Sequence, residues 1–342
     1  MSSATDIVKS LRKQKLDVSI LSDENSPCIV KGRLSTGCLV LDAIMGGGLP
    51  FGRLTTMYGD ASSGKSLIAA QIAALAQQDG VLVAYDDTEG TVSIEMMKML
   101  GVNVDDLIYT SSDTIEDVFN FFEHTLAEKN KIAPDKDLLL IWDSIAAASS
   151  DTEMENPYGK SNMGRNAQVI SQSLRKFSHA IAKENVCALF LNQVRQKIGV
   201  MFGDSTATPG GEAVRFYSSV MVKLDLAAKL KAPAKKGKPK IIGMNTTATC
   251  VKNKTAFPFR SATLPIYFGH AIDDPKATML YLIDQEMVTA SGAYYTLELN
   301  GKQYKFTKKT FVELYDKMYD DIAALVMSIE DADADVDQEK EE

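Results

Sequence analysis

The sequence predicts an α/β protein built on a mostly parallel central sheet, with antiparallel strands at one edge of that sheet. Three near-continuous apolar segments, separated by helix-forming stretches, indicate strands buried on both faces: 81–87, 138–144 and 187–193. Strands of this kind are typical of a parallel sheet covered by helices. Directly after residue 214 the helical pattern stops, and three segments are interpreted as antiparallel edge strands: 216–226, 241–252 and 261–269.

The chain divides into four parts. Residues 1–33 hold a short basic amphipathic helix at 5–16 and a linker. Residues 34–269 form the α/β core, with further strands at 53–59 and 107–110 and helices at 66–78, 93–100, 114–129 and 164–184. Residues 270–328 mix short strands with helices, which predicts a small α+β C-terminal domain. Residues 329–342 are expected to be an acidic, disordered tail.

Composition narrows the class of protein. The chain has 342 residues, 45% of them hydrophobic, which is enough for a sizeable core. No apolar run is long enough to span a membrane, and the first fifteen residues lack the apolar segment of a signal peptide. Four scattered cysteines and three histidines argue against a disulfide framework or a zinc site. We therefore expect a cytoplasmic protein.

The net charge of −8 is concentrated at the C-terminus. Residues 330–342 hold eight acidic residues and one lysine, so the rest of the chain is nearly neutral and can carry a basic groove. Such a tail is commonly a solvated end. The alternative is that it competes with an anionic ligand for a basic surface, such as the lysine-rich loop at 229–240 or Lys302, Lys305, Lys308 and Lys309.

A glycine-rich segment, "GDASSGKS" at 59–66, lies between an expected strand and an expected helix. The pattern G-x-x-x-x-G-K-[ST] in this context predicts a phosphate-binding loop, whose backbone N–H groups converge on a nucleotide. We expect Lys65 to reach the β- and γ-phosphates of ATP, and Ser66 to offer its hydroxyl to Mg²⁺. The expected nucleotide-binding residues here are Gly59, Asp60, Ala61, Ser62, Ser63, Gly64, Lys65 and Ser66.

Polar side chains follow three of the expected strands and should lie at the same edge of the sheet. A carboxylate there can hold the Mg²⁺ shell or polarise a water molecule, and an amide can sense the γ-phosphate. Taken singly, each residue is equally explained as a helix cap or a solvated strand end. Together with the phosphate loop, these side chains predict ATP hydrolysis. They are Asp143 after the strand at 138–144, Asp86, Asp87 and Glu89 after the strand at 81–87, and Asn192 and Gln193 after the strand at 187–193.

The segment 195–211 predicts a long, glycine-hinged loop that mixes basic and apolar residues, which is unusual for a core. It suits an element that becomes ordered on single-stranded nucleic acid, with cations on phosphates and an apolar wedge between bases. A lid or a subunit contact is the alternative reading. The candidate DNA-binding residues are Arg195, Lys197, Ile198, Gly199, Gly210 and Gly211.

Five segments resemble the bacterial RecA recombinases: "STGCLVLDAIMGGGLPFGR" (35–53), "GDASSGKS" (59–66), "NQVRQKIGVMFG" (192–203), "GGEAVRFY" (210–217) and "VKNKTAFPF" (251–259). The likeness runs in order over 34–269 and is weaker over 270–328. It implies a RecA-like phosphate-loop ATPase core with ATP and Mg²⁺ as cofactors. It also implies filaments on single-stranded DNA that pair with a homologous duplex and exchange strands, with single-strand binding and mediator proteins as further partners.

The resemblance also implies roles for individual residues. Glu89 would be the catalytic carboxylate, with Lys65 at the phosphates and Ser66 and Asp143 at Mg²⁺. Gln193 would link the γ-phosphate to the DNA loop. Residues 1–33 would serve subunit docking. The other implied positions are Lys252 and Lys254 reaching the ATP of the adjacent subunit, Arg215 and Phe216 at that interface, and Met163, Gly164 and Arg165 in a second DNA loop.

The chain departs from the family pattern in places. Met96 stands where the family commonly has an aromatic side chain that stacks on adenine, so selectivity for adenine is expected to be looser. Asp60 and Ala61 replace a Pro-Glu pair in the phosphate loop. Gln168 stands where an arginine is expected, and Arg165 is placed to compensate. Pro209 removes one backbone donor from the DNA loop.

Two other functions fit the same phosphate loop. A ring-forming helicase or translocase would lack the chemistry of the 192–217 segment and would unwind DNA. A non-catalytic scaffold switched by ATP would lack a working Glu89. We expect a single-stranded-DNA-dependent ATPase and recombinase.

Overall fold

The computed structural model describes residues 3–16, 18–23, 26, 28–155, 163–196, 206–207, 209–232 and 238–332. Within these residues the central sheet has nine strands, and six of them are parallel. In spatial order the parallel strands are β10 (Val220–Lys231), β3 (Leu54–Gly59), β7 (Cys187–Gln193), β6 (Leu138–Asp143), β4 (Leu82–Asp87) and β5 (Leu107–Thr110). The mostly parallel sheet predicted from the apolar segments is confirmed.

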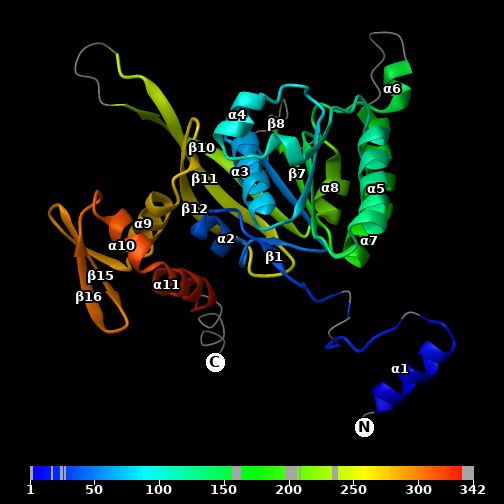
Figure 1. Ribbon diagram of the computed structural model, residues 1–342, viewed down its shortest axis with the longest axis horizontal. Helices are drawn as coiled ribbons and strands as arrows, with labels where there is room; N and C mark the ends of the chain where they lie inside the picture. The colour runs from blue at the N-terminus through cyan, green and yellow to red at the C-terminus, as the bar shows by residue number, and fades with distance from the viewer. Residues whose placement is uncertain are drawn as a thin grey trace.

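One face of the sheet is covered by α5 (Ile115–Ile132), α7 (Met163–Glu184) and α8 (Gly211–Tyr217) (Figure 1). Phe119 and Phe122 of α5 meet Phe177 of α7 and Phe190 of β7, with ring centroids 5.5–6.3 Å apart. Trp142 of β6 joins this cluster and is fully buried. The even-numbered residues of β6 therefore point to this face, and Leu139 and Ile141 point to the other. That is why β6 is apolar without alternation.

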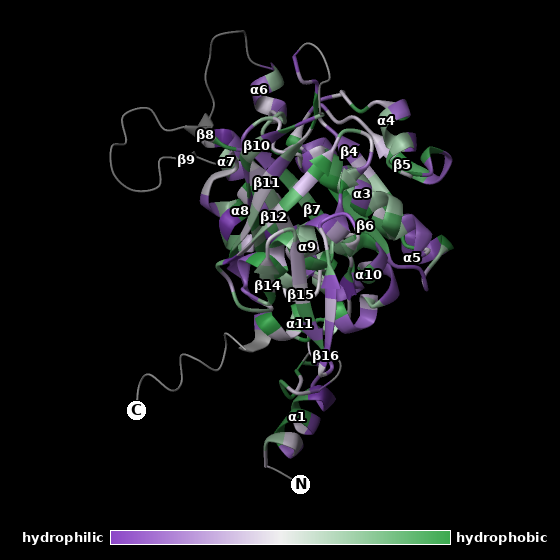
Figure 2. Cartoon of the chain, turned by 90° about the vertical axis from the view of Figure 1, so that its left-hand side faces the viewer, coloured by the Kyte–Doolittle hydropathy of each residue, from purple (hydrophilic) through white to green (hydrophobic). Residues whose placement is uncertain are grey.

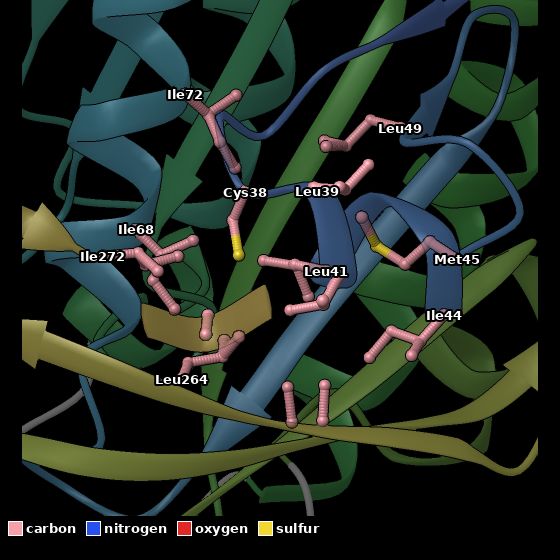
Figure 3. Close-up of a cluster of buried hydrophobic side chains, with 14 of the residues drawn as sticks. Cys38, Leu39, Leu41, Ile44, Met45, Leu49, Ile68, Ile72, Leu264 and Ile272 are labelled. Atoms are coloured by element: carbon pink, nitrogen blue, oxygen red, sulfur yellow. The ribbon is translucent and has the colours of Figure 1, made fainter. Parts of the chain in front are cut away.

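The other face is covered by α3 (Lys65–Gln78), with α2 (Leu39–Ile44) and α9 (Asp274–Asp284) beside it. Ile68 and Ile72 of α3 pack against Cys38 at the start of α2 and against Leu264 and Ile272 of the edge strands (Figure 3). Alanines at 69, 70, 73 and 74 are buried, which lets α3 approach the sheet closely. This packing places the first turn of α3 directly above the end of β3.

The antiparallel edge begins one strand later than the sequence predicts. β10 is parallel to β3, and only its other side pairs antiparallel, with β11 (Ile241–Asn253). β12 (Arg260–Tyr267) and β13 (Ala271–Ile272) follow in antiparallel order. The residues at 216–217 close α8 instead of starting a strand. α8 completes a crossover from β7, so the next strand enters the sheet in the parallel direction.

The C-terminal part contains a three-stranded antiparallel sheet of β14 (Val288–Ser291), β15 (Tyr294–Leu299) and β16 (Lys302–Phe306). α10 (Phe311–Lys317) and α11 (Tyr319–Ala332) follow. Their buried side chains belong to the same hydrophobic cluster as α2 and α9. The segment expected as a tail begins inside α11, where Glu330 is 4% exposed and ion-paired with Arg260.

The N-terminal helix α1 (Ser3–Lys13) has no buried residues and lies apart from the rest of the chain (Figure 1). Green, apolar residues concentrate on the central strands in Figure 2, and purple ones on the outward faces of the helices. None of the helices within the described residues is long and apolar enough to cross a membrane. The remaining short elements are β1 (Arg33–Leu34), β2 (Leu49–Pro50), α4 (Ile94–Met99), a 3₁₀ turn (Val104–Asp106), α6 (Asp151–Glu155), β8 (Arg195–Gln196) and β9 (Thr206–Ala207).

Candidate nucleotide and DNA sites

The phosphate loop connects β3 to α3 and needs both of its glycines. Gly64 has φ +97°, and a Cβ there would lie 2.6 Å from Ile266 Cδ1. A Cβ on Gly59 would lie 2.1 Å from the Leu224 carbonyl oxygen. The Ser63 carbonyl also accepts a hydrogen bond from Thr246 Oγ1 at 3.0 Å, which ties the loop to β11. The backbone is thus curled and held at the N-terminus of α3, as a phosphate cradle requires.

Lys65 is buried in this loop. Its Nζ donates to the carbonyl oxygens of Gly59 at 3.0 Å and Asp60 at 2.9 Å. Burial lowers the pKa of Lys65, while Asp143, Glu89 and Asp60 act in the opposite direction. A lysine held among convergent backbone groups beside two carboxylates is poised to bind an anion that carries Mg²⁺.

Ser66 and Asp143 form the part of the site that suits Mg²⁺. The Ser66 hydroxyl acts to lower the pKa of the Asp143 carboxyl, and Tyr85 Oη donates to Asp143 Oδ2 at 2.9 Å. Burial raises the pKa of Asp143. A hydroxyl and a carboxylate side by side at a phosphate loop provide the oxygen ligands that Mg²⁺ prefers, so these residues fit the metal.

Glu89 is held by donors from two strand ends. Its Oε1 accepts from Ser144 Oγ at 3.0 Å, just after β6, and from Gln193 Nε2 at 2.9 Å, at the end of β7. Thr88 is fixed as well, because its Oγ1 donates to the Ser144 carbonyl at 2.8 Å. The carboxylate predicted to polarise water and the amide predicted to sense the γ-phosphate are therefore in direct contact.

The structure separates Glu89 from its two acidic neighbours. Asp86 is buried away from the cavity, where Ser112 Oγ donates to its Oδ2 at 2.5 Å, and burial raises its pKa to about 6. Asp87 accepts from the backbone N–H of Val92 at 2.8 Å and of Glu89 at 3.2 Å. Both carboxylates hold the segment that carries Glu89, and Glu89 alone of the three lines the cavity.

A cavity of about 490 Å³ joins these groups. Its polar end is formed by the phosphate loop with Asp143, Glu89 and Gln193, and its apolar end includes Met96, as expected from the sequence. Gly59 and Asp60 do not line it and contribute backbone carbonyls instead. Phe268, Gly269 and Met244 line it too, and sequence reasoning missed them. Sequence position gives no signal for these three, because only the folded chain brings Met244 of β11 and the β12–β13 turn to the cavity, with Gly269 close to Met99 of α4.

Lys252 and Lys254 lie on a different surface. Lys252 Nζ donates to the carbonyl oxygens of Arg215 and Phe216, and Lys254 Nζ donates to Phe216 O at 3.1 Å. Lys254 also lies over the Phe216 ring, 5.5 Å from its centroid. Burial, with Lys254 and Arg215 nearby, lowers the pKa of Lys252 to about 8. The structure thus groups the four residues expected at the subunit interface, away from the cavity of their own chain.

The described candidates for DNA binding lie where α7 and α8 begin. Gly164 and Arg165 are exposed in the first turn of α7, and Arg165 Nη1 donates to Gln168 Oε1 at 3.2 Å. Gly210 and Gly211 begin α8, which packs against α7. Asn192 Nδ2 donates to the Pro209 carbonyl at 2.8 Å, so the end of β7 holds the end of the loop.

The structure describes only the backbone of Met163, in α7, and of Arg195, in β8. Lys197, Ile198 and Gly199 lie outside the described residues. Their contacts with DNA remain predictions from the sequence.

Comparison with known proteins identifies the family of this chain. A family model for the RecA N-terminal domain matches residues 4–273. Protein RecA of Geobacter sulfurreducens is 38% identical over 276 residues, which cover 80% of this chain and 78% of that protein. Protein RecA of Lactobacillus delbrueckii is 35% identical over 310 residues, covering 90% and 81%. Protein RecA of Clostridioides difficile is 39% identical over 264 residues, covering 77% and 73%. The chain belongs to the RecA family of recombinases.

Proposed function

We propose that this protein is a single-stranded-DNA-dependent ATPase that forms filaments on single-stranded DNA and catalyses homologous pairing and strand exchange. The observation that carries the proposal is the 2.9 Å hydrogen bond from Gln193 Nε2 to Glu89 Oε1. It connects the proposed catalytic carboxylate to the strand that leads into the 195–211 loop. A direct contact of this kind lets DNA binding and ATP hydrolysis influence each other.

Each residue in the cavity has a proposed part in hydrolysis. The phosphate loop and Lys65 bind and orient the triphosphate, and Ser66 and Asp143 hold Mg²⁺, which supplies charge neutralisation when bound. Glu89 takes the proton of the attacking water. Ser144 keeps the carboxylate at the cavity, since its hydroxyl donates to Glu89 Oε1.

The proposed coupling passes through Gln193. When the loop after β7 binds DNA, the Gln193 amide shifts toward the γ-phosphate and releases Glu89 for catalysis. Asn192 supports this path, because it links β7 to Pro209 at the other end of the loop. Arg195, Lys197 and the segment around Gly164 and Arg165 would then contact the DNA backbone.

The positions of Lys252 and Lys254 are the reason that we propose an assembly of several copies. Both lysines are grouped with Arg215 and Phe216 away from the cavity of the same chain. Cations that complete a phosphoryl-transfer site can be supplied by a neighbouring subunit. A contact between two different faces repeats from copy to copy, and such contacts generate rings or helical filaments.

Electron microscopy with single-stranded DNA and a non-hydrolysable ATP analogue tests the proposal. We expect helical filaments whose formation requires both ligands. A strand-exchange assay with homologous and heterologous duplexes should show product with the homologous one alone. Closed rings together with duplex unwinding would contradict the proposal and favour a helicase.

A further inference from the structure

Two tyrosines on neighbouring strands make the same kind of contact. Tyr85 of β4 and Tyr109 of β5 are partners in the parallel register. Each donates its hydroxyl to an aspartate on the next strand toward the centre of the sheet: Tyr85 to Asp143 Oδ2 at 2.9 Å, and Tyr109 to Asp87 Oδ2 at 3.3 Å. In both pairs the aspartate lies two residues beyond the register partner of the tyrosine. One diagonal contact is therefore repeated on adjacent strands.

The two aspartates that accept these bonds lie in different surroundings. Asp143 lines the nucleotide cavity beside the phosphate loop. Asp87 does not line it, and its carboxylate accepts instead from the backbone N–H groups of Val92 and Glu89. The Tyr85 hydroxyl thus reaches a carboxylate of the proposed Mg²⁺ site, whereas the Tyr109 hydroxyl reaches a carboxylate that holds the backbone.

Tyr85 is a rigid donor that lies behind the cavity wall. Its side chain is 0% exposed, belongs to the hydrophobic cluster under α3, and does not line the cavity. Because close packing leaves such a ring few alternative rotamers, the position of its hydroxyl is set by the sheet. The backbone of Asp143 is fixed as well, since its carbonyl accepts from the Thr88 N–H at 2.9 Å.

The contact with Tyr85 determines how the Asp143 carboxylate is turned. Its Oδ2 is engaged by the buried hydroxyl, which leaves Oδ1 as the oxygen available to a cation in the cavity. Carboxylates that bind metals are generally held by hydrogen bonds from a surrounding shell of residues. Loss of one such partner typically lowers metal affinity by about 10- to 100-fold.

We infer that Tyr85 is a positioning residue for the Mg²⁺ site, whose hydroxyl holds the Asp143 carboxylate in the orientation that binds Mg²⁺ or a water molecule of the ion. Tyr85 acts only through Asp143, because its own side chain does not reach the cavity. This role rests on the proposed function, since it concerns the site proposed for ATP and Mg²⁺. The competing explanation is that a buried tyrosine hydroxyl simply needs a partner, which would affect stability and not metal binding.

The test uses Tyr85→Phe, which removes the hydroxyl and keeps the ring. Mn²⁺ takes the same oxygen ligands as Mg²⁺, and its free concentration can be measured by electron paramagnetic resonance. With a non-hydrolysable ATP analogue and protein in excess, we expect the Mn²⁺ affinity to fall about 10- to 100-fold. The affinity for a fluorescent ATP analogue in EDTA should equal that of wild type, because the phosphate loop is unchanged.

Tyr109→Phe is the matched control, since it removes the hydroxyl of the equivalent contact one strand away, and it should leave the Mn²⁺ affinity unchanged. In an Asp143→Asn background, Tyr85→Phe should cause no further loss, because the hydroxyl acts through that carboxylate. DNA-stimulated hydrolysis by Tyr85→Phe should require more Mg²⁺ and reach nearly the wild-type maximal rate. Circular dichroism and urea unfolding check that each variant is folded.

The outcomes separate this role from the proposed function. If wild type binds Mn²⁺ normally, an unchanged affinity in Tyr85→Phe, or an equal loss in Tyr109→Phe, would overturn the role of Tyr85 alone. Weaker nucleotide binding in EDTA, or a further loss in the Asp143→Asn background, would overturn it in favour of a general effect on the fold. A wild-type protein that binds no Mn²⁺ with the nucleotide would overturn the proposed ATPase site as well.

Discussion

At the scale of single residues, the site is organised around one carboxylate oxygen. Oε1 of Glu89 accepts hydrogen bonds from Ser144 and Gln193, which come from neighbouring strands. If Gln193 moves toward the γ-phosphate as we propose, the Ser144 donor still positions the carboxylate, so Glu89 needs little reorganisation when it accepts a proton. Lys65, on the other side of the cavity, is positioned by two backbone carbonyls. We therefore expect ATP binding and ATP hydrolysis to depend on different residues, so that mutation can separate them.

The first prediction concerns this separation. Glu89→Gln should retain ATP binding and lower hydrolysis about 10²- to 10⁴-fold, because it removes the general base. Lys65→Ala should lose nucleotide binding and, with it, tight DNA binding. Equilibrium binding of a fluorescent ATP analogue and steady-state phosphate release measure the two effects. Glu95→Gln, an exposed carboxylate on α4, is the matched control. Normal turnover in Glu89→Gln would show that another group is the base.

At the scale of elements, α2 is joined to the C-terminal helices by the partly buried carboxylate of Asp274. Asp274 Oδ1 accepts from the N-terminal backbone N–H of α2, at Leu39, at 2.7 Å, and Asp274 Oδ2 accepts from Tyr315 Oη at 2.5 Å. Asp42 of α2 accepts from Thr36 Oγ1 at 2.7 Å and from Ser35 Oγ at 2.6 Å. Burial raises the pKa of Asp42 to about 6 and also raises that of Asp274.

The second prediction is a pH dependence of stability. The folded state binds the Asp42 proton more tightly than the unfolded state does, so the free energy of unfolding should fall as pH rises from about 4 to about 6. Asp274, Cys38 and Tyr319 are the titratable neighbours. Asp42→Asn should remove up to about 3 kcal/mol of this change, since one pKa unit corresponds to about 1.4 kcal/mol.

Urea unfolding at several pH values from 4.5 to 7.5 measures this dependence. Asp320→Asn, an exposed carboxylate at the start of α11, should leave it unchanged. An Asp42→Asn variant with the same pH dependence as wild type would contradict the assignment of this pKa.

At the scale of the whole molecule, two different surfaces carry the groups that we propose to meet between copies. One carries Lys252, Lys254 and Phe216, and the other carries the nucleotide cavity. The helix α1 has no buried residues in the isolated chain, which fits an element that packs on another copy.

The third prediction is complementation between variants. Lys252→Ala and Lys254→Ala should each lower ATP hydrolysis by about 10³-fold or more while leaving the fold intact, because the cation acts in trans. Mixing Lys252→Ala with Glu89→Gln should restore part of the activity, since some interfaces then contain every group. Circular dichroism checks the fold and phosphate release measures the rate. Wild-type hydrolysis by both lysine variants would exclude the shared site.

The fourth prediction concerns the acidic tail. Truncation after Ala332 should strengthen duplex binding at low salt and lower the Mg²⁺ needed for strand exchange, because the tail no longer competes for basic surfaces. Duplex affinity measured against salt for the two proteins tests this. If duplex affinity depends on salt identically in the two proteins, the tail does not compete with DNA and is only a solvated end.

The structure also sets where that truncation can be made. Cutting after Ile329 would remove Glu330 and leave Arg260, 10% exposed at its side chain, without its ion-pair partner. Breaking a buried pair in this way costs about 3–5 kcal/mol. The shorter protein should therefore unfold at lower urea, which would obscure any effect on DNA.

Features that depend on local geometry could be predicted from the sequence alone. The phosphate loop could be located because its two glycines, its lysine and its serine lie within one short segment, 59–66. The buried strands could be located because a strand covered on both faces has no polar positions. Most helix bounds followed from apolar periodicity, so that the expected helix at 164–184 is α7 with bounds of Met163–Glu184.

Only the tertiary structure decided which distant segments are neighbours. Phe268 enters the nucleotide cavity, Asp86 and Glu89 are separated into a buried and a cavity-lining carboxylate, and Glu330 is paired with Arg260 instead of belonging to a tail. The physical reason is that the spacing of apolar residues along the chain reflects only the local backbone conformation and which face of a helix or strand is buried. The order of strands, and hence the contacts between them, depends on packing of the whole chain, which no single segment contains.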